Sequence, residues 1–86
     1  MPLSLPFWFP LRQGKAEPAG PDTYRLTAPN LAEAFISIRQ EGNGRWSAAL
    51  RKSADGPEVA VTEAEFPSPY EAWEAAFELY RQDVVI

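Results

Sequence analysis

The side chains in this sequence that could do acid–base chemistry are carboxylates, because the chain contains neither histidine nor cysteine. There are twelve Asp and Glu residues, and the densest group consists of Glu63, Glu65, Glu71 and Glu74. Two carboxylates can act as general acid and general base, but no spacing in this group demands a catalytic pair. Negative charge is also favoured on solvated surfaces and at helix N-termini. We therefore expect a solvated acidic edge here.

Nucleophilic, phosphate-binding and metal sites also lack their usual residues. The five serines have no histidine base, and none stands three residues before a lysine. The Gly-Asn-Gly run at 42–44 is too short for a phosphate loop and precedes a predicted strand. Zinc sites of the usual kind need Cys or His ligands. We expect a protein that is not an enzyme and that holds no cofactor or metal.

The overall charge and the apolar runs restrict the partners. The 86 residues are enough for a single small domain, and their net charge is −4. An acidic domain repels nucleic acid and anionic membranes unless its basic residues gather on one face. No apolar run approaches the roughly 20 residues needed to span a bilayer. The first basic residue is Arg12, and prolines interrupt the apolar start, which argues against a secretory signal. We expect a cytoplasmic protein with no membrane contact.

Four segments alternate apolar and polar side chains, as half-buried strands do. They are 23–27, 34–40, 45–52 and 58–65. Residues 41–44, Glu-Gly-Asn-Gly, favour a hairpin turn, because Gly and Asn tolerate positive φ. Keeping the apolar faces together places Ile38 opposite Trp46. The same register pairs Ile36 with Ala48 and centres the loop on Gly42.

An amphipathic helix should follow the strands. Residues 68–71, Ser-Pro-Tyr-Glu, match a capping box with proline at the first helical position. Apolar residues then recur with helical spacing, which predicts a helix over 69–83 and a docked or strand-like tail over 84–86. The fold class is thus α+β: an antiparallel three- to four-stranded β-meander with one C-terminal helix packed on one face. The predicted core is Tyr24, Leu26, Ile36, Ile38, Trp46, Leu50, Val59, Val61, Phe66, Trp73, Ala76, Phe77 and Tyr80.

The first 22 residues differ in composition from the rest, with five of the nine prolines. Residues 3–11 are rich in large apolar groups and should be extended, since each residue before a proline is displaced from the α region. Residues 12–22 read as a polar linker, so we divide the chain into an arm and linker over 1–22 and a domain over 23–86. The aromatic residues Phe7, Trp8 and Phe9 leave two alternatives. The arm folds back on its own sheet or helix, or it docks on a partner or on a second copy.

The sheet face opposite the helix should be flat, with small residues between four larger ones: Phe35, Arg39, Arg45 and Arg51. Such arginines are usually solvated and balanced by neighbouring glutamates. A sheet face bearing arginine can also lie in the major groove of DNA. This leaves nucleic-acid binding as a second hypothesis.

Residues 34–82 combine a Trp-containing middle strand, an Asp-Gly turn at 55–56 and a Phe-Pro-Ser-Pro-Tyr-Glu-Ala-Trp helix start at 66–73. This order of parts resembles the arm-binding domains of phage-type integrases, which implies a three-stranded sheet with one helix and DNA contact through the sheet. Those domains are basic, whereas this chain is acidic, which puts the DNA contact in doubt. Our leading hypothesis is therefore a protein-interaction module that uses the aromatic arm and the sheet face. Its partner would be another protein or a second copy, and weak nucleic-acid binding through the arginines is the alternative.

Overall fold

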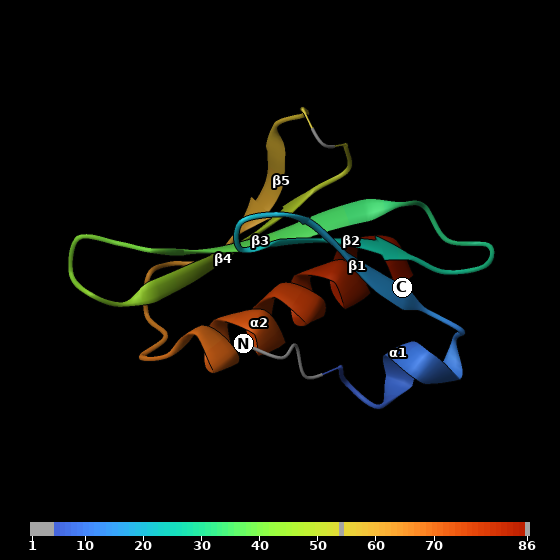
Figure 1. Cartoon of the computed structure of the whole chain (residues 1–86), viewed down its shortest axis with the longest axis horizontal. Helices are drawn as coiled ribbons and strands as arrows, with labels where there is room; N and C mark the ends of the chain where they lie inside the picture. The colour runs from blue at the N-terminus through green and yellow to red at the C-terminus, as the bar shows by residue number, and fades with distance from the viewer. Residues whose placement is uncertain (1–4, 54, 86) are drawn as a thin grey trace.

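The computed structural model contains one antiparallel sheet of five strands in the order β1-β2-β3-β4-β5, with helix α2 packed across one face (Figure 1). It describes residues 5–53 and 55–85. The first four residues of the predicted arm, Ala54 of the second predicted turn and Ile86 lie outside that range. The predicted α+β meander with a C-terminal helix is confirmed, with one strand more than expected. Within the described residues, no helix has the length and apolar character needed to cross a membrane.

Four of the strands correspond to the predicted segments. They are β2 (Thr23–Thr27), β3 (Ala34–Gln40), β4 (Trp46–Arg51) and β5 (Glu58–Val61). The bounds of β2 and β3 match the prediction, whereas β5 is shorter than the predicted 58–65. After β5 the chain rejoins the sheet only at an isolated bridge between Phe66 and Trp46.

The additional strand, β1 (Lys15–Gly20), lies in the segment that the sequence predicted to be a linker. It pairs with β2, with Glu17 opposite Arg25 and Pro18 opposite Tyr24. A proline fits a strand at the edge of a sheet, where its missing N–H does not interrupt pairing between inner strands. The predicted boundary between residues 22 and 23 therefore falls at the turn between β1 and β2.

The predicted pairing of β3 with β4 is wrong by two residues. Ile38 lies opposite Ala48 and Ile36 lies opposite Leu50. The loop closes around Asn43, because the Glu41 N–H donates to the Arg45 carbonyl at 2.8 Å. A shift of two residues keeps each side chain on its face of the sheet. The core face of both strands was therefore predicted correctly.

The face of β5 was predicted incorrectly. Ala60 lies opposite Leu50 and Val61 opposite Ala49, and a bulge follows where Glu58 lies opposite Arg51. Because Leu50 is a core residue, Ala60 also packs against the core and Val61 points to the opposite side. Val59 and Val61, which the sequence placed in the core, are 47% and 59% exposed. A slip of one residue reverses the faces of a strand, and a bulge produces such a slip.

Helix α2 (Pro69–Tyr80) begins where the capping motif predicted. The Ser68 hydroxyl accepts a hydrogen bond from the Glu71 N–H at 3.4 Å, with Pro69 in the first turn. The chain then widens into a π-helical turn, η1 (Arg81–Val85), instead of the predicted continuation of the helix to Asp83. The ring of Trp73 is buried edge-on against Tyr24, with ring centroids 5.2 Å apart. The apolar face of α2 thus fills the space beneath β3 and β4.

The N-terminal arm is not extended. Trp8–Leu11 form one helical turn, α1, which Figure 1 shows beside α2. Pro10 fits this turn, because the first N–H groups of a helix have no partner within the helix. The Phe9 N–H donates to the Pro6 carbonyl, and the Gly14 N–H donates back to the Phe9 carbonyl. These bonds close the chain around the side chain of Phe9.

Candidate interaction surfaces

Two of the three arm aromatics predicted to be interaction residues hold the arm on the domain. The Phe9 side chain is fully buried, and its ring packs edge-on against Phe77 and Tyr80 at centroid distances of 5.3 and 5.8 Å. Trp8 is half-buried and stacks on Tyr80 with centroids 6.3 Å apart and planes 11° apart. Burial raises the pKa of the Tyr80 hydroxyl above its ordinary value. Phe9 is therefore part of the core, and Trp8 packs against it, so both side chains hold the arm on α2.

The third arm aromatic, Phe7, is presented to solvent. Its side chain is 81% exposed, although its neighbour Trp8 is held against the helix. Pro6 and Trp8, on either side of Phe7 in the chain, line a groove of about 370 Å³ between the arm and α2. We call this the arm–helix groove; it is lined by Leu5, Pro6 and Trp8 from the arm and by Tyr70, Glu74, Phe77 and Glu78 from α2.

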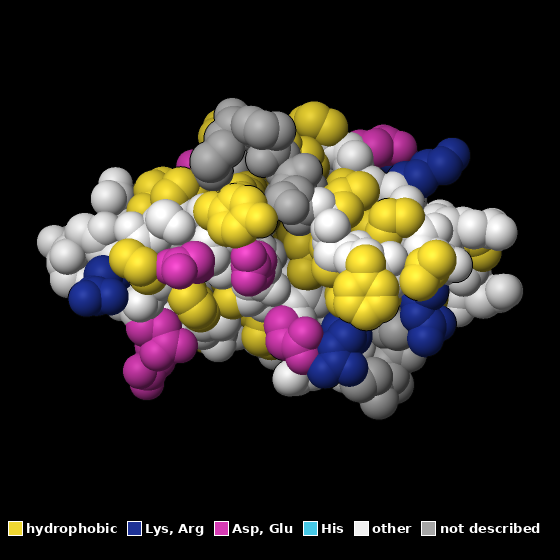
Figure 2. Space-filling model, turned by 90° about the horizontal axis from the view of Figure 1, so that it is seen from below, with side chains coloured by type: hydrophobic (Ala, Val, Ile, Leu, Met, Phe, Trp, Pro, Cys, Tyr) yellow, Lys and Arg dark blue, Asp and Glu magenta, His cyan; other side chains and the backbone are white. Residues whose placement is uncertain are grey.

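The surface around the arm–helix groove mixes apolar and acidic side chains. Figure 2 shows this side of the molecule, with hydrophobic side chains spread across it and carboxylates between them. Tyr70 is 50% exposed. Hydrogen bonds from Arg81 hold the pKa of Glu78 below its ordinary value, and they pair its carboxylate with the Arg81 guanidinium. The sequence analysis did not single out Tyr70, but its spacing of four and seven residues to Glu74 and Phe77 places all three on one face of α2.

The sheet face opposite α2 was predicted to be flat, but it is hollowed. Small side chains, Ser37, Ser47 and Ala49, form its floor, and β5 rises out of the plane of the sheet on one side (Figure 1). The turn between β1 and β2, with Asp22, borders it on the other side. The resulting depression measures about 490 Å³, and we call it the outer groove. Its remaining borders include Arg39 of β3 with Glu41 just after that strand, and Glu58 and Val61 of β5 with Thr62 just after it.

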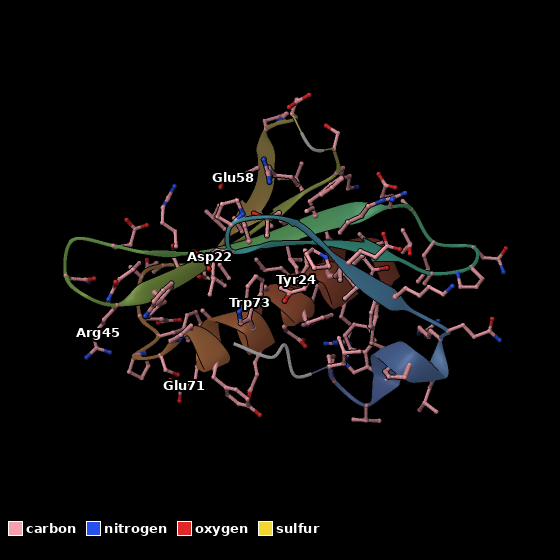
Figure 3. The ribbon with its side chains drawn as sticks, viewed as in Figure 1. Asp22, Tyr24, Arg45, Glu58, Glu71 and Trp73 are labelled. Atoms are coloured by element: carbon pink, nitrogen blue, oxygen red, sulfur yellow. The ribbon has the colours of Figure 1, made fainter. Side chains whose placement is uncertain are left out.

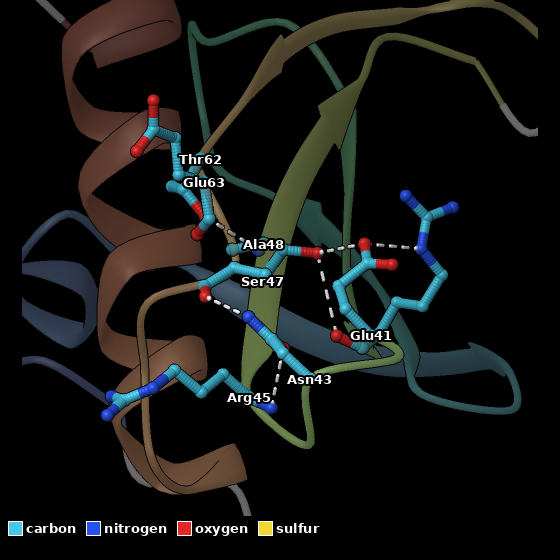
Figure 4. A network of polar contacts seen from close by, with 9 residues as sticks. Glu41, Asn43, Arg45, Ser47, Ala48, Thr62 and Glu63 are labelled. Carbon is cyan, nitrogen blue, oxygen red and sulfur yellow. Dashed lines mark hydrogen bonds and ion pairs between the residues drawn. The ribbon is translucent and has the colours of Figure 1, made fainter.

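A chain of hydrogen bonds fixes the end of the outer groove nearest the β3–β4 turn (Figure 4). The Ser47 hydroxyl bonds to a carboxylate oxygen of Glu41 at 3.1 Å, and the Arg39 guanidinium donates to the same oxygen at 3.1 Å. The next residue of β4, Ala48, donates its N–H to the hydroxyl of Thr62, just after β5, at 2.9 Å. Because these groups bond to one another, the floor and one wall of the groove are held together by the protein itself.

The structure does not gather the three predicted arginines into one cluster. Arg39 borders the outer groove and is paired with Glu41. Arg45 precedes β4; its guanidinium donates to the Glu65 carbonyl at 3.1 Å, and Figure 3 shows it below the sheet, on the α2 side. Arg51 lies at the far end of β4, opposite Phe35 and Glu58. The carboxylates of the outer groove outnumber its single arginine.

Phe35, the remaining predicted interaction residue, does point to the outer face. The sheet register places it between Arg25 on β2 and Arg51 on β4. Its side chain is buried, in keeping with the habit of arginine stems of covering apolar surface. Phe35 therefore adds little accessible area to the outer groove.

The acidic residues that could have done acid–base chemistry are spread along the corner between β5 and α2. Glu63, Glu65, Glu71 and Glu74 are all exposed. In the part of the chain that the structure describes, no group of three or more acidic side chains is placed to hold a metal ion. Asp22, Glu58 and Val61 of the outer groove were not predicted as site residues, because a bulge and a turn without a strong sequence signal bring them together.

Comparison of the chain with known protein families, curated proteins and solved structures finds no significant match. The case for a function therefore rests on the arm–helix groove and the outer groove.

Proposed function

We propose that this protein is a non-catalytic interaction domain whose arm–helix groove binds an apolar segment of a protein partner. One observation carries the proposal: Phe7 is 81% exposed although the half-buried Trp8 and the fully buried Phe9 anchor the turn that it begins. Exposed large apolar side chains beside a concave surface are typical of protein-binding sites.

The anchoring matters because it lowers the cost of binding. A flexible aromatic segment loses conformational entropy when a partner immobilises it. Here Trp8 is already stacked on Tyr80, so Phe7 and the groove beside it keep one arrangement. Aromatic residues dominate the energetics of protein interfaces, and Phe7 and Tyr70 supply two with large exposed areas.

The alternative, nucleic-acid binding through Arg39, Arg45 and Arg51, has less support from the arrangement of charges. Arg39 is paired with a carboxylate, and Arg45 donates to a backbone carbonyl on another part of the surface. Phosphate recognition needs several cations on one surface. This alternative stays a prediction and becomes one outcome of the experiment below.

The experiment uses the full chain as bait in an extract of the cells that produce it, followed by direct titration of each captured protein. The test variant combines Phe7→Ser with Tyr70→Ser. The matched control is Leu11→Ser, which removes a side chain that is 77% exposed on the same arm. Unlike those of Phe7, the chain neighbours of Leu11 do not line the groove. We expect the test variant to weaken binding by at least about tenfold, because truncated hot-spot residues cost about 2 kcal/mol or more. The control should bind like the original chain.

Sedimentation of the same proteins measures self-association. If the original chain self-associates and the test variant does not, the partner is a second copy of the chain. A captured nucleic acid whose affinity falls steeply with salt would instead favour the arginine alternative. Equal binding by the test variant and by Leu11→Ser would overturn the proposed use of the arm–helix groove.

A further inference from the structure

The two edge strands of the sheet differ in how well they could pair with another chain. β1 carries Lys15 and Pro18, and charge and proline are the usual means by which natural sheets block edge pairing. β5 reads Glu-Val-Ala-Val, with no proline and no basic residue. Its Val59 and Val61 side chains are exposed. Figure 1 shows β5 projecting from the sheet. The edge of β5 therefore lacks the lysine and the proline that block the edge of β1, although β5 is short and bulged at Glu58.

The hydrogen-bonding pattern shows which backbone groups of β5 face outward. The Thr62 N–H donates to the Ala48 carbonyl at 2.9 Å, so Thr62 directs its N–H toward β4. In an antiparallel pair, successive residues direct their N–H and C=O groups to opposite sides. The backbone groups of Val61 therefore point away from β4, toward the free edge. An added strand could pair there without disturbing the existing ladder.

The outer groove beside this edge has an acidic lining. Its carboxylates are Asp22, Glu41 and Glu58, and its one basic side chain is Arg39. The guanidinium of Arg39 lies 3.1 Å from Glu41, so these two charges offset each other. Asp22, at the turn between β1 and β2, and Glu58, on β5, come from opposite sides of the groove (Figure 3). They leave an excess of negative charge where a basic side chain would be complementary.

We propose that the free edge of β5 accepts an extended, lysine- or arginine-bearing segment of a partner protein as a sixth strand, with a basic side chain in the outer groove. Strand addition takes its affinity from main-chain hydrogen bonds and its specificity from pockets for alternate side chains. β5 and the outer groove supply both elements side by side. A second copy of this chain would bring its own Glu58 and a net charge of −4 to an acidic surface, which disfavours it as the occupant.

The test needs no knowledge of the natural partner. Two blocked peptides of about nine residues serve as probes, one alternating lysine and valine and the other alternating glutamate and valine; side chains of an added strand alternate between its faces. Each is titrated into the isotope-labelled full chain and followed by NMR. We expect only the lysine peptide to shift the amide signals of residues 59–62 and to slow hydrogen exchange of the Val61 amide.

Two variants separate the main-chain and charge contributions. Val61→Pro removes the outward N–H while leaving the bonds from β5 to β4 in place, so it should weaken binding of the lysine peptide at least about tenfold. Asp22→Lys combined with Glu58→Lys should weaken it at least about tenfold through charge. The matched control, Glu17→Lys, reverses one acidic charge on β1, outside the outer groove. It should change the affinity for the lysine peptide by less than about twofold. Spectra of all variants outside β5 report whether each is folded.

Several outcomes would overturn the proposal. The two peptides could bind equally, or the lysine peptide could fail to bind. Alternatively, both Val61→Pro and the double variant of Asp22 and Glu58 could bind the lysine peptide as the original chain does. Protection of the Val61 amide in the free protein that disappears on dilution would show that a second copy occupies the edge. Phe7→Ser with Tyr70→Ser should leave peptide binding unchanged, so this proposal and that for the arm–helix groove can fail separately.

Discussion

The two sides of the sheet use their side chains in different ways. On the α2 side, the rings of Trp8, Phe9, Phe77 and Tyr80 lie against one another with centroids 5.3–6.4 Å apart. On the opposite side, small residues form the floor of the outer groove, and polar groups surround it. A small domain has little apolar area available for its core. This chain therefore concentrates that area on one side and leaves the other side hollow.

The difference changes how the arm should be understood. Phe7 and Phe9 are two residues apart in one helical turn, yet the first is exposed and the second is fully buried. The arm is thus a structural element that also presents an exposed aromatic side chain, that of Phe7. The outer groove, by contrast, is bordered by side chains that the core does not need. Substitutions on the two sides should accordingly separate into large and small effects on stability.

The largest effect is expected at Phe9. Replacing Phe9 with alanine should lower the free energy of unfolding by about 3–5 kcal/mol, because it leaves a cavity between α1 and α2. Such a loss is a large part of the roughly 5–15 kcal/mol that stabilises a typical domain. Denaturant titration of both proteins measures it.

Phe7→Ala is the matched control for Phe9, since it makes the same change two residues away on an exposed ring. It should change the free energy of unfolding by less than about 0.5 kcal/mol. Similar effects of the two changes would mean that the arm is not docked, and the contrast between the two sides of the sheet would then fail.

The parts of the fold that follow from periodicity could be predicted from the sequence. β2, β3 and the start of α2 each have a strong local signal, namely alternation of apolar residues or a capping motif at Ser68. β1 could not be predicted, because its residues alternate weakly and Pro18 argues against a strand. Its pairing with β2 depends on contact between segments, which no local pattern reports.

The two grooves were harder to predict than the strands. The exposed position of Phe7 and the burial of Phe9 depend on how one turn packs against α2, and both side chains have the same chemistry. The outer groove depends on the bulge that reverses β5, so Val61 was assigned to the core. The alternating pattern of the strands placed Arg39 and Arg45 on one face of the sheet. In the structure, Arg39 pairs with Glu41 beside the outer groove, and Arg45 donates to the Glu65 carbonyl on the α2 side.

An intermediate effect is expected at Gly14, where the backbone approaches the buried ring of Phe9. A Cβ atom added at Gly14 would lie 2.5 Å from the Phe9 ring, closer than any real contact allows. Gly14→Ala should therefore destabilise the protein by about 1–3 kcal/mol through overpacking.

The control for this change is Gly42→Ala, where an added Cβ has nothing within 4 Å. It should be nearly neutral, or slightly stabilising through the unfolded state. Thermal or chemical unfolding of both variants gives the comparison. An equally stable Gly14→Ala protein would show that α1 can move away from α2 at little cost, and the arm would lose its structural role.

The smallest effect is expected on the outer side, at Val61. Valine and threonine have similar shapes and both suit strands, so Val61→Thr mainly exchanges a methyl group for a hydroxyl. Because Val61 is 59% exposed, the change should alter the free energy of unfolding by less than about 0.5 kcal/mol. Replacing Ile36, which is buried on the core face of β3, with threonine should cost more than about 1 kcal/mol, since it buries a hydroxyl and also shortens an apolar side chain in the core. Denaturant titration of both variants tests the reversed face of β5 directly. A loss at Val61 as large as that at Ile36 would place Val61 in the core, and the outer groove would then lose one of its walls.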